Sequence, residues 1–160
     1  MMQAIEDWEC TPLAAARQPP KDAAVASSRW YNEAVAATRA KRILVVDDDQ
    51  AIREELAAVL GEDPAVDISV ADDGWTALQQ IATGQFWPDV ILLDLMMPRL
   101  NGDDFLAALD AINGTREIAL IAITALPRTG VSEAVRRRAR SILFKPFTLT
   151  QLGASLAVAR

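Results

Sequence analysis

The sequence predicts an α/β domain in which one parallel sheet is covered by helices on both faces. Five short apolar runs alternate with five segments of helical periodicity, which is typical of parallel strands joined by crossover helices. Several of these runs show no alternation of apolar and polar residues, as expected for strands buried on both faces. The predicted strands are residues 43–46, 66–71, 89–94, 118–124 and 141–144. The predicted helices are residues 50–60, 74–82, 103–112, 132–139 and 148–160.

The first strand and helix carry the clearest local signals. The run ILVV at 43–46 is apolar and β-branched, and the segment QAIREELAAVL at 50–60 places its large apolar residues on one helical face. We expect Asp49 to cap this helix, because a short polar side chain accepts hydrogen bonds from the free N–H groups of the first turn. Gly61 is expected to end it.

The later elements have signals of their own. The helix at 103–112 begins with two acids, which the positive end of a helix dipole favours. The run IALIAIT at 118–124 is the most apolar of the predicted strands. The closing helix at 148–160 has Thr148 or Thr150 as its expected cap.

Residues 1–40 differ from the rest in composition and are predicted to form an N-terminal extension outside the domain at 41–160. They are rich in alanine, contain three prolines and show no sustained periodicity. Two interpretations are open. The extension is mobile, or residues 28–40 form a short docking helix that carries Trp30 and Tyr31.

The composition excludes several kinds of chemistry. The chain has no histidine and a single cysteine, so it lacks a histidine base, an intramolecular disulfide and the ligands of a thiolate zinc site. The net charge of −6 argues against direct nucleic-acid binding. No apolar run is long enough to span a membrane, and the N-terminus lacks the pattern of a signal peptide. We therefore expect a cytoplasmic protein without membrane contact.

Polar residues gather where the predicted strands end. The first strand ends in Asp47, Asp48 and Asp49, the third in Asp94, and the fourth in Thr124. The fifth is followed by a lysine. Carboxylates in one cleft repel one another and raise each other's pKa, and a hard divalent cation such as Mg²⁺ relieves the repulsion. A hydroxyl and an ammonium nearby suit a phosphoryl group, so the pattern predicts a Mg²⁺-dependent phosphoryl site.

Four motifs in this order resemble the receiver domain of two-component response regulators: VVDDD, ILLDLMMPRLNG, ITA and FKPF. The resemblance covers about residues 41–160. It implies a flavodoxin-like (βα)5 fold, a doubly wound parallel sheet with strand order 2-1-3-4-5.

The resemblance also implies the roles of individual residues. Asp94 is the expected phosphoacceptor, whose carboxylate attacks a phosphoryl group and forms an acyl phosphate. The expected Mg²⁺ ligands are Asp48 directly, Asp47 partly through water, Asp94, and the backbone carbonyl of Met96.

Two further residues complete the expected catalytic set. Thr124 would donate its hydroxyl to the phosphoryl group, and Lys145 would neutralise another of its oxygens. Pro146 is expected to follow a cis peptide bond that aims this lysine.

Three features depart from the family pattern. Receivers usually carry an aromatic switch residue that couples to Thr124, and here that residue is Ile142, so we expect signalling through loop and helix movement instead. The helix at 132–139 should be short or displaced, and its arginines are either a solvated helix end or a surface for an acidic partner. Met96 and Leu126 flank the expected hydrolytic water, and neither can orient or deprotonate it, so we expect slow self-dephosphorylation.

We therefore expect a stand-alone response regulator rather than an enzyme. A sensor histidine kinase or a histidine phosphotransfer protein would donate to Asp94, and an unknown downstream protein would receive the signal. The alternative is a degenerate receiver that acts as an interaction module without phosphorylation. An aspartyl-phosphate enzyme would need an acid where Met96 stands, and a flavodoxin would need a phosphate loop where the aspartates stand.

Overall fold

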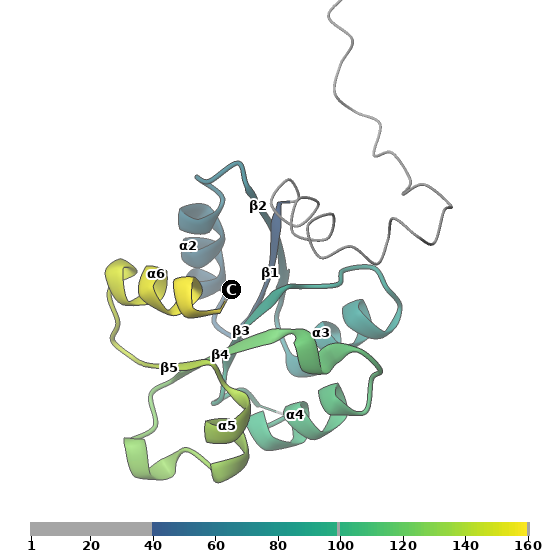
Figure 1. Ribbon diagram of the computed structural model, residues 1–160. Helices are drawn as coiled ribbons and strands as arrows, with labels where there is room; N and C mark the ends of the chain where they lie inside the picture. Colours follow the sequence, from purple (N-terminus) through teal and green to yellow (C-terminus); the bar gives the residue numbers. More distant parts are fainter. Residues whose placement is uncertain (1–39, 99, 160) are drawn as a thin grey trace, which may run out of the picture. The chain divides into compact units, whose positions relative to one another are not determined.

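The computed structural model describes residues 40–98 and 100–159. Five strands alternate with helices along this part of the chain (Figure 1). The strands are β1 (Lys41–Val46), β2 (Val66–Ala71), β3 (Val90–Asp94), β4 (Ala119–Thr124) and β5 (Ser141–Phe144). The α-helices are α2 (Gln50–Leu60), α3 (Gly74–Ala82), α4 (Gly102–Asp110), α5 (Glu133–Arg138) and α6 (Leu149–Val158). Two short 3₁₀ helices, η1 (Thr115–Glu117) and η2 (Arg128–Gly130), lie on either side of β4 in the chain.

All neighbouring strands are parallel and their order is β2-β1-β3-β4-β5, which confirms the predicted fold class. Helices α2 and α6 cover one face of the sheet, and α3, α4 and α5 cover the other (Figure 1). Each face has its own apolar cluster. Every residue of β3 and β4 is buried, so the two strands are held on both sides.

All predicted strand and helix boundaries hold to within two residues, and two of the shifts have local causes. β1 begins at Lys41, two residues early, because the backbone N–H of Lys41 donates to the carbonyl of Ala65. α4 ends at Asp110 rather than at 112. The buried hydroxyl of Thr115 donates to the carbonyls of Leu109 and Ile112, which fixes a turn there.

The caps decide how three helices begin. The side chain of Asp49 accepts from the N–H groups of Ala51 and Ile52, which confirms its predicted role at the start of α2. Thr148, rather than Thr150, caps α6, and it forms a capping box with Gln151. Ser132 caps α5.

Helix α5 is only six residues long, as the unusual sequence of this region predicts, and both of its ends are tied to α4. Its capping hydroxyl on Ser132 donates to the carboxylate of Asp103. At the other end, Arg138 Nε lies 3.4 Å from Asp110 Oδ1, and the same guanidinium donates to the carbonyls of Thr115 and Ile118.

The predicted N-terminal extension, and the docking helix within it, lie outside the described residues except for Ala40. None of the helices within 40–98 and 100–159 is both long enough and apolar enough to cross a membrane.

The cap of α2 gives a test of the fold. Replacing Asp49 with alanine removes the acceptor for two N–H groups and should lower the free energy of unfolding by about 1 kcal/mol. Urea unfolding in the presence of a chelator measures the change. Asp49→Ser, which keeps a capping oxygen, should stay near the native stability, and equal losses in both variants would contradict this account.

Candidate functional site

Three carboxylates meet at the carboxyl ends of β1 and β3. Asp47 and Asp94 are buried, whereas Asp48 is exposed. One oxygen from each of the three lies within 4.8 Å of the others. The meeting follows from the sheet, because β1 and β3 are direct neighbours and both strands end at the same edge.

Lys145 bridges the two buried carboxylates. Its Nζ lies 2.6 Å from Asp94 Oδ2 and 3.0 Å from Asp47 Oδ2. Lys145 follows β5, so its side chain extends along the sheet edge past the end of β4. The sequence places this lysine at the correct edge of the sheet, and the structure shows that it contacts two of the aspartates.

Burial and pairing shift the pKa of both partners. Burial raises the pKa of Asp47 above the ordinary aspartate value, and the bonds it accepts from Asp49 and Lys145 offset only part of this rise. Burial by itself lowers the pKa of Lys145, but the hydrogen bonds that it donates to Asp94 and Asp47, together with their negative charges, outweigh burial and raise the pKa overall. The ammonium is therefore held in its charged form between two acids.

The three carboxylates differ in how many of their oxygens have protein partners. Asp47 Oδ1 accepts from the N–H of Asp49 at 2.9 Å, and Asp94 Oδ1 accepts from the N–H of Met96 at 2.8 Å. Their second oxygens accept from Lys145. Asp48, in contrast, has no side-chain partner in the part of the chain that the structure describes. Asp48 is thus the carboxylate with both oxygens open to a cation.

Arg53 is a site residue that sequence reasoning missed. Its Nη1 donates to the backbone carbonyl of Asp47 at 2.7 Å, so α2 holds the end of β1 in place. The position of Arg53, one turn into the helix that Asp49 caps, was predictable from the sequence. The sequence did not show that its side chain faces the end of β1, because that depends on the path of the loop between β1 and α2.

Thr124 is fully buried at the end of β4, between β3, which ends in Asp94, and β5, which Lys145 follows. Its Oγ1 accepts a hydrogen bond from the N–H of Leu126 at 3.0 Å. Because the oxygen serves as an acceptor there, the hydroxyl hydrogen remains available for another group.

The residues at which the sequence departs from the family pattern lie in two loops at this edge of the sheet and within β5. Met96 is half exposed and Leu126 is partly buried in the loops after β3 and β4. Ile142 is partly buried on β5 and pairs with Ala122 of β4. The peptide bond between Lys145 and Pro146 is cis, as predicted.

The donor set fits a hard divalent cation. All three ligand residues offer carboxylate oxygens, which Mg²⁺ prefers over the nitrogen and sulfur ligands that zinc and copper favour. The open Asp48 would bind directly, and Asp47 and Asp94 already have donors on each oxygen. The carbonyl of Met96 as a further ligand stays a prediction.

Comparison with known proteins gives the same family across most of the described chain. The family model described as the response regulator receiver domain matches residues 43–157. The response regulator MprA of Mycobacterium tuberculosis is 41% identical over 115 residues, which make up 69% of this chain and 46% of that protein. A protein-glutamate methylesterase/protein-glutamine glutaminase of Anaeromyxobacter dehalogenans is 39% identical over 99 residues, 61% of this chain and 26% of that protein. The chain therefore spans less than half the length of these curated relatives.

A solved structure agrees with the sequence matches. The response regulator receiver domain protein from Clostridium thermocellum superposes with a TM-score of 0.65 at 26% identity, covering 74% of this chain and 93% of that one. The fold, the order of the motifs and the matched range lead to one conclusion: the chain belongs to the response regulator receiver domain family.

Proposed function

We propose that this protein is a phosphoacceptor that takes a phosphoryl group from a phosphohistidine donor onto Asp94 and signals through contacts with another protein. One observation carries the proposal: the buried carboxylate of Asp94 touches the ammonium of Lys145 and lies beside Asp47 and Asp48. This arrangement offers a nucleophile together with charges of both signs for a transferred phosphoryl group.

The transfer itself needs little from the protein beyond positioning. An oxygen of Asp94 forms a bond to phosphorus while the bond from phosphorus to the donor nitrogen breaks. Lys145 moves from the Asp94 carboxylate to an oxygen of the incoming phosphoryl group, and the free hydrogen of Thr124 is donated to another. The backbone N–H of Met96 keeps the Asp94 side chain aimed at the edge of the sheet.

Asp47, Asp48, Asp94 and the Met96 carbonyl would hold Mg²⁺. When bound, the ion supplies positive charge to the phosphoryl oxygens and orients them for in-line transfer. Arg53 and Asp49 support this set by fixing the backbone and side chain of Asp47.

The partners follow from the proposed chemistry. A sensor histidine kinase or a histidine phosphotransfer protein would supply the phosphoryl group, and an unknown downstream protein would read the result. One of the longer relatives is a methylesterase/glutaminase. In the reaction proposed here, however, Asp47, Asp48 and Lys145 assist the modification of Asp94, a residue of the chain itself. Action as a stand-alone receiver in the cytoplasm stays a prediction.

Phosphorylation is tested with acetyl phosphate and Mg²⁺, followed by intact mass. The native chain should gain one phosphoryl group, and Asp94→Asn should gain none, because an amide cannot form the acyl phosphate. A modification that survives in the Asp94→Asn variant, or none on the native chain, overturns the proposal.

The second candidate is a degenerate receiver that binds partners without phosphorylation. Ile142, in the place of the usual aromatic switch, favours it. The same experiment separates the two, because the degenerate receiver would remain unmodified while folded.

Metal binding gives a second test. Asp48→Asn should weaken Mg²⁺ binding by tenfold or more, about 1.4 kcal/mol, since it removes the carboxylate of the cluster that has no donor among the described residues. Asp49→Asn is the matched control, because asparagine also caps helices and the side chain lies outside the cluster. Isothermal titration calorimetry measures both, and equal affinities would show that Asp48 is not a ligand.

The lifetime of the acyl phosphate gives a third test. We expect it to persist for much longer than seconds, because neither Met96 nor Leu126 can position a water. Met96→Asn should speed hydrolysis by about tenfold by orienting the water, whereas Met96→Leu should leave the rate unchanged. Loss of the phosphoryl mass over time in Mg²⁺ is the measurement, and a native half-life of seconds would contradict the expectation.

A further inference from the structure

A pocket of about 340 Å³ lies between α5 and β5 and includes none of the residues of the proposed phosphoacceptor site. Its apolar floor consists of Ile142 and Phe144, which lie two residues apart on β5 and therefore share one face of the sheet. Both side chains are only partly buried, and both pack against the apolar cluster of this face. The floor is thus a part of the core that the short α5 leaves open.

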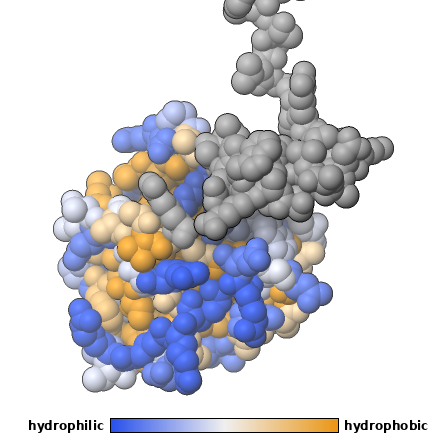
Figure 2. Space-filling view, in the orientation of Figure 1, coloured by the Kyte–Doolittle hydropathy of each residue, from blue (hydrophilic) through white to orange (hydrophobic). Residues whose placement is uncertain are grey.

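Three exposed arginines surround this floor: Arg128, Arg136 and Arg140. Residues 128–140 hold five arginines and one acid in a chain whose net charge is −6. Figure 2 shows hydrophilic side chains gathered over α5 on this face of the molecule. Positive charge is therefore concentrated around this pocket on a protein that is acidic as a whole.

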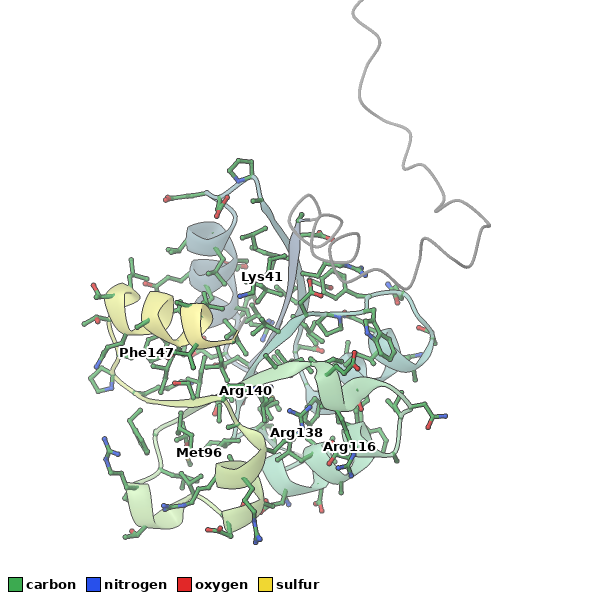
Figure 3. The ribbon with its side chains drawn as sticks, viewed as in Figure 1. Lys41, Met96, Arg116, Arg138, Arg140 and Phe147 are labelled. Carbon is green, nitrogen blue, oxygen red and sulfur yellow. The ribbon has the colours of Figure 1, made fainter. Side chains whose placement is uncertain are left out.

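The three pocket arginines differ from their neighbours in lacking a carboxylate partner. Arg137 pairs with Glu133, whereas Arg116 and Arg138 both approach Asp110 at the end of α4. Figure 3 shows Arg140 at the start of β5, with Arg138 and Arg116 beyond it toward α4. Within residues 40–98 and 100–159, none of the three pocket arginines forms an ion pair.

Most of the hydrogen-bond donors around the pocket are left for a ligand. Arg136 donates from Nε to the carbonyl of Val131 and from Nη2 to the carbonyl of Arg128. The side chains of Arg128 and Arg140 donate no hydrogen bond to any residue that the structure describes. A guanidinium carries only donors, so a ligand that satisfies this rim must be rich in acceptors.

Two of the guanidinium groups are already restricted in position. Arg136 is held by its two carbonyls, and the guanidinium of Arg128 lies 4.9 Å from the centre of the Phe144 ring, a cation–π distance. Binding to groups that are ordered beforehand costs less entropy. The rim is therefore prepared for an anion before the anion arrives.

From this arrangement we infer that the pocket binds a nucleotide, a small molecule that joins a planar ring to phosphate groups. The ring lies over the floor beside Ile142, and the phosphate oxygens pair with the arginines of the rim. Guanidinium groups bind phosphate through paired hydrogen bonds and also stack on nucleobases. The volume lies at the low end of the roughly 300–1,000 Å³ of ligand pockets, which suits one such molecule.

The lining requires both halves of this ligand. Inorganic phosphate would leave the apolar floor against water, and an uncharged ring would leave the arginines without acceptors. Guanosine diphosphate (GDP) is the probe of choice, because guanine adds two adjacent acceptors that match the fork of an arginine.

Binding is tested on the full chain, labelled with ¹⁵N, by titrating GDP in the presence of EDTA. The chelator removes any metal that would attract the phosphates to the aspartate cluster. Amide shifts are expected at Ile142, Phe144 and along α5. Arg140→Glu should weaken binding by about tenfold or more, because a charge-assisted bond is replaced by repulsion. Arg137→Glu, the same charge change at an arginine outside the pocket, should change the affinity far less.

Two fragments of the probe test the two halves of the pocket. Guanosine, which lacks phosphate, and pyrophosphate, which lacks the ring, should each bind more weakly than GDP. No shift with GDP, or equal affinities for Arg140→Glu and Arg137→Glu, overturns the inference. Pyrophosphate binding as tightly as GDP would show a bare anion site instead. A single-stranded oligonucleotide that displaces GDP at lower concentration would show a nucleic-acid surface.

The controls keep these outcomes separate from loss of the fold and from the proposed phosphoryl transfer. Thermal unfolding of Arg140→Glu should match that of the native chain, because the Arg140 side chain makes no hydrogen bond or ion pair with a described residue. Arg128→Gln is a second variant, with the same expected loss of affinity. The titration is repeated on Asp94→Asn, so GDP binding stands or fails whether or not Asp94 accepts a phosphoryl group.

Discussion

The sharing of one ammonium by two buried carboxylates is the interaction on which the rest of this structure depends. Asp47 and Asp94 lie at the ends of adjacent strands, where their charges repel in a medium poor in water. The ammonium of Lys145, which follows β5, contacts both carboxylates and offsets that repulsion. For Lys145 to reach both carboxylates, β4 must lie between β3 and β5, so the charge balance of the site depends on the order of the strands.

The two apolar layers give this constraint its rigidity. Residues of β3 and β4 face both layers and are buried throughout, so the sheet edge that carries the acids has little freedom to spread. Arg53 adds a polar tie from α2 to the end of β1. Packing thus holds the three carboxylates close enough together for a cation to bind favourably there.

The fold and most of the site were predictable because their signals are local. Apolar runs mark the strands, and parallel strands bring Asp47, Asp94 and Thr124 to one edge. Hydrogen bonds from side chains to backbone carbonyls a few residues away were not predictable. Arg53 reaches a carbonyl rather than a charged partner, and the hydroxyl of Thr115 ends α4 from five residues beyond it. No periodicity in the sequence records such bonds, since they depend on the path of the loops.

The fastening of α5 to α4 has a mechanical consequence. Ser132 donates a hydrogen bond to Asp103 at one end of α5, and Arg138 forms an ion pair with Asp110 at the other end. The two helices therefore form one rigid layer on the sheet. A displacement of α5 must either carry α4 with it or break polar bonds at both ends. Any signal that moves this region is therefore spread over two helices, and the surface that a partner meets changes as a unit.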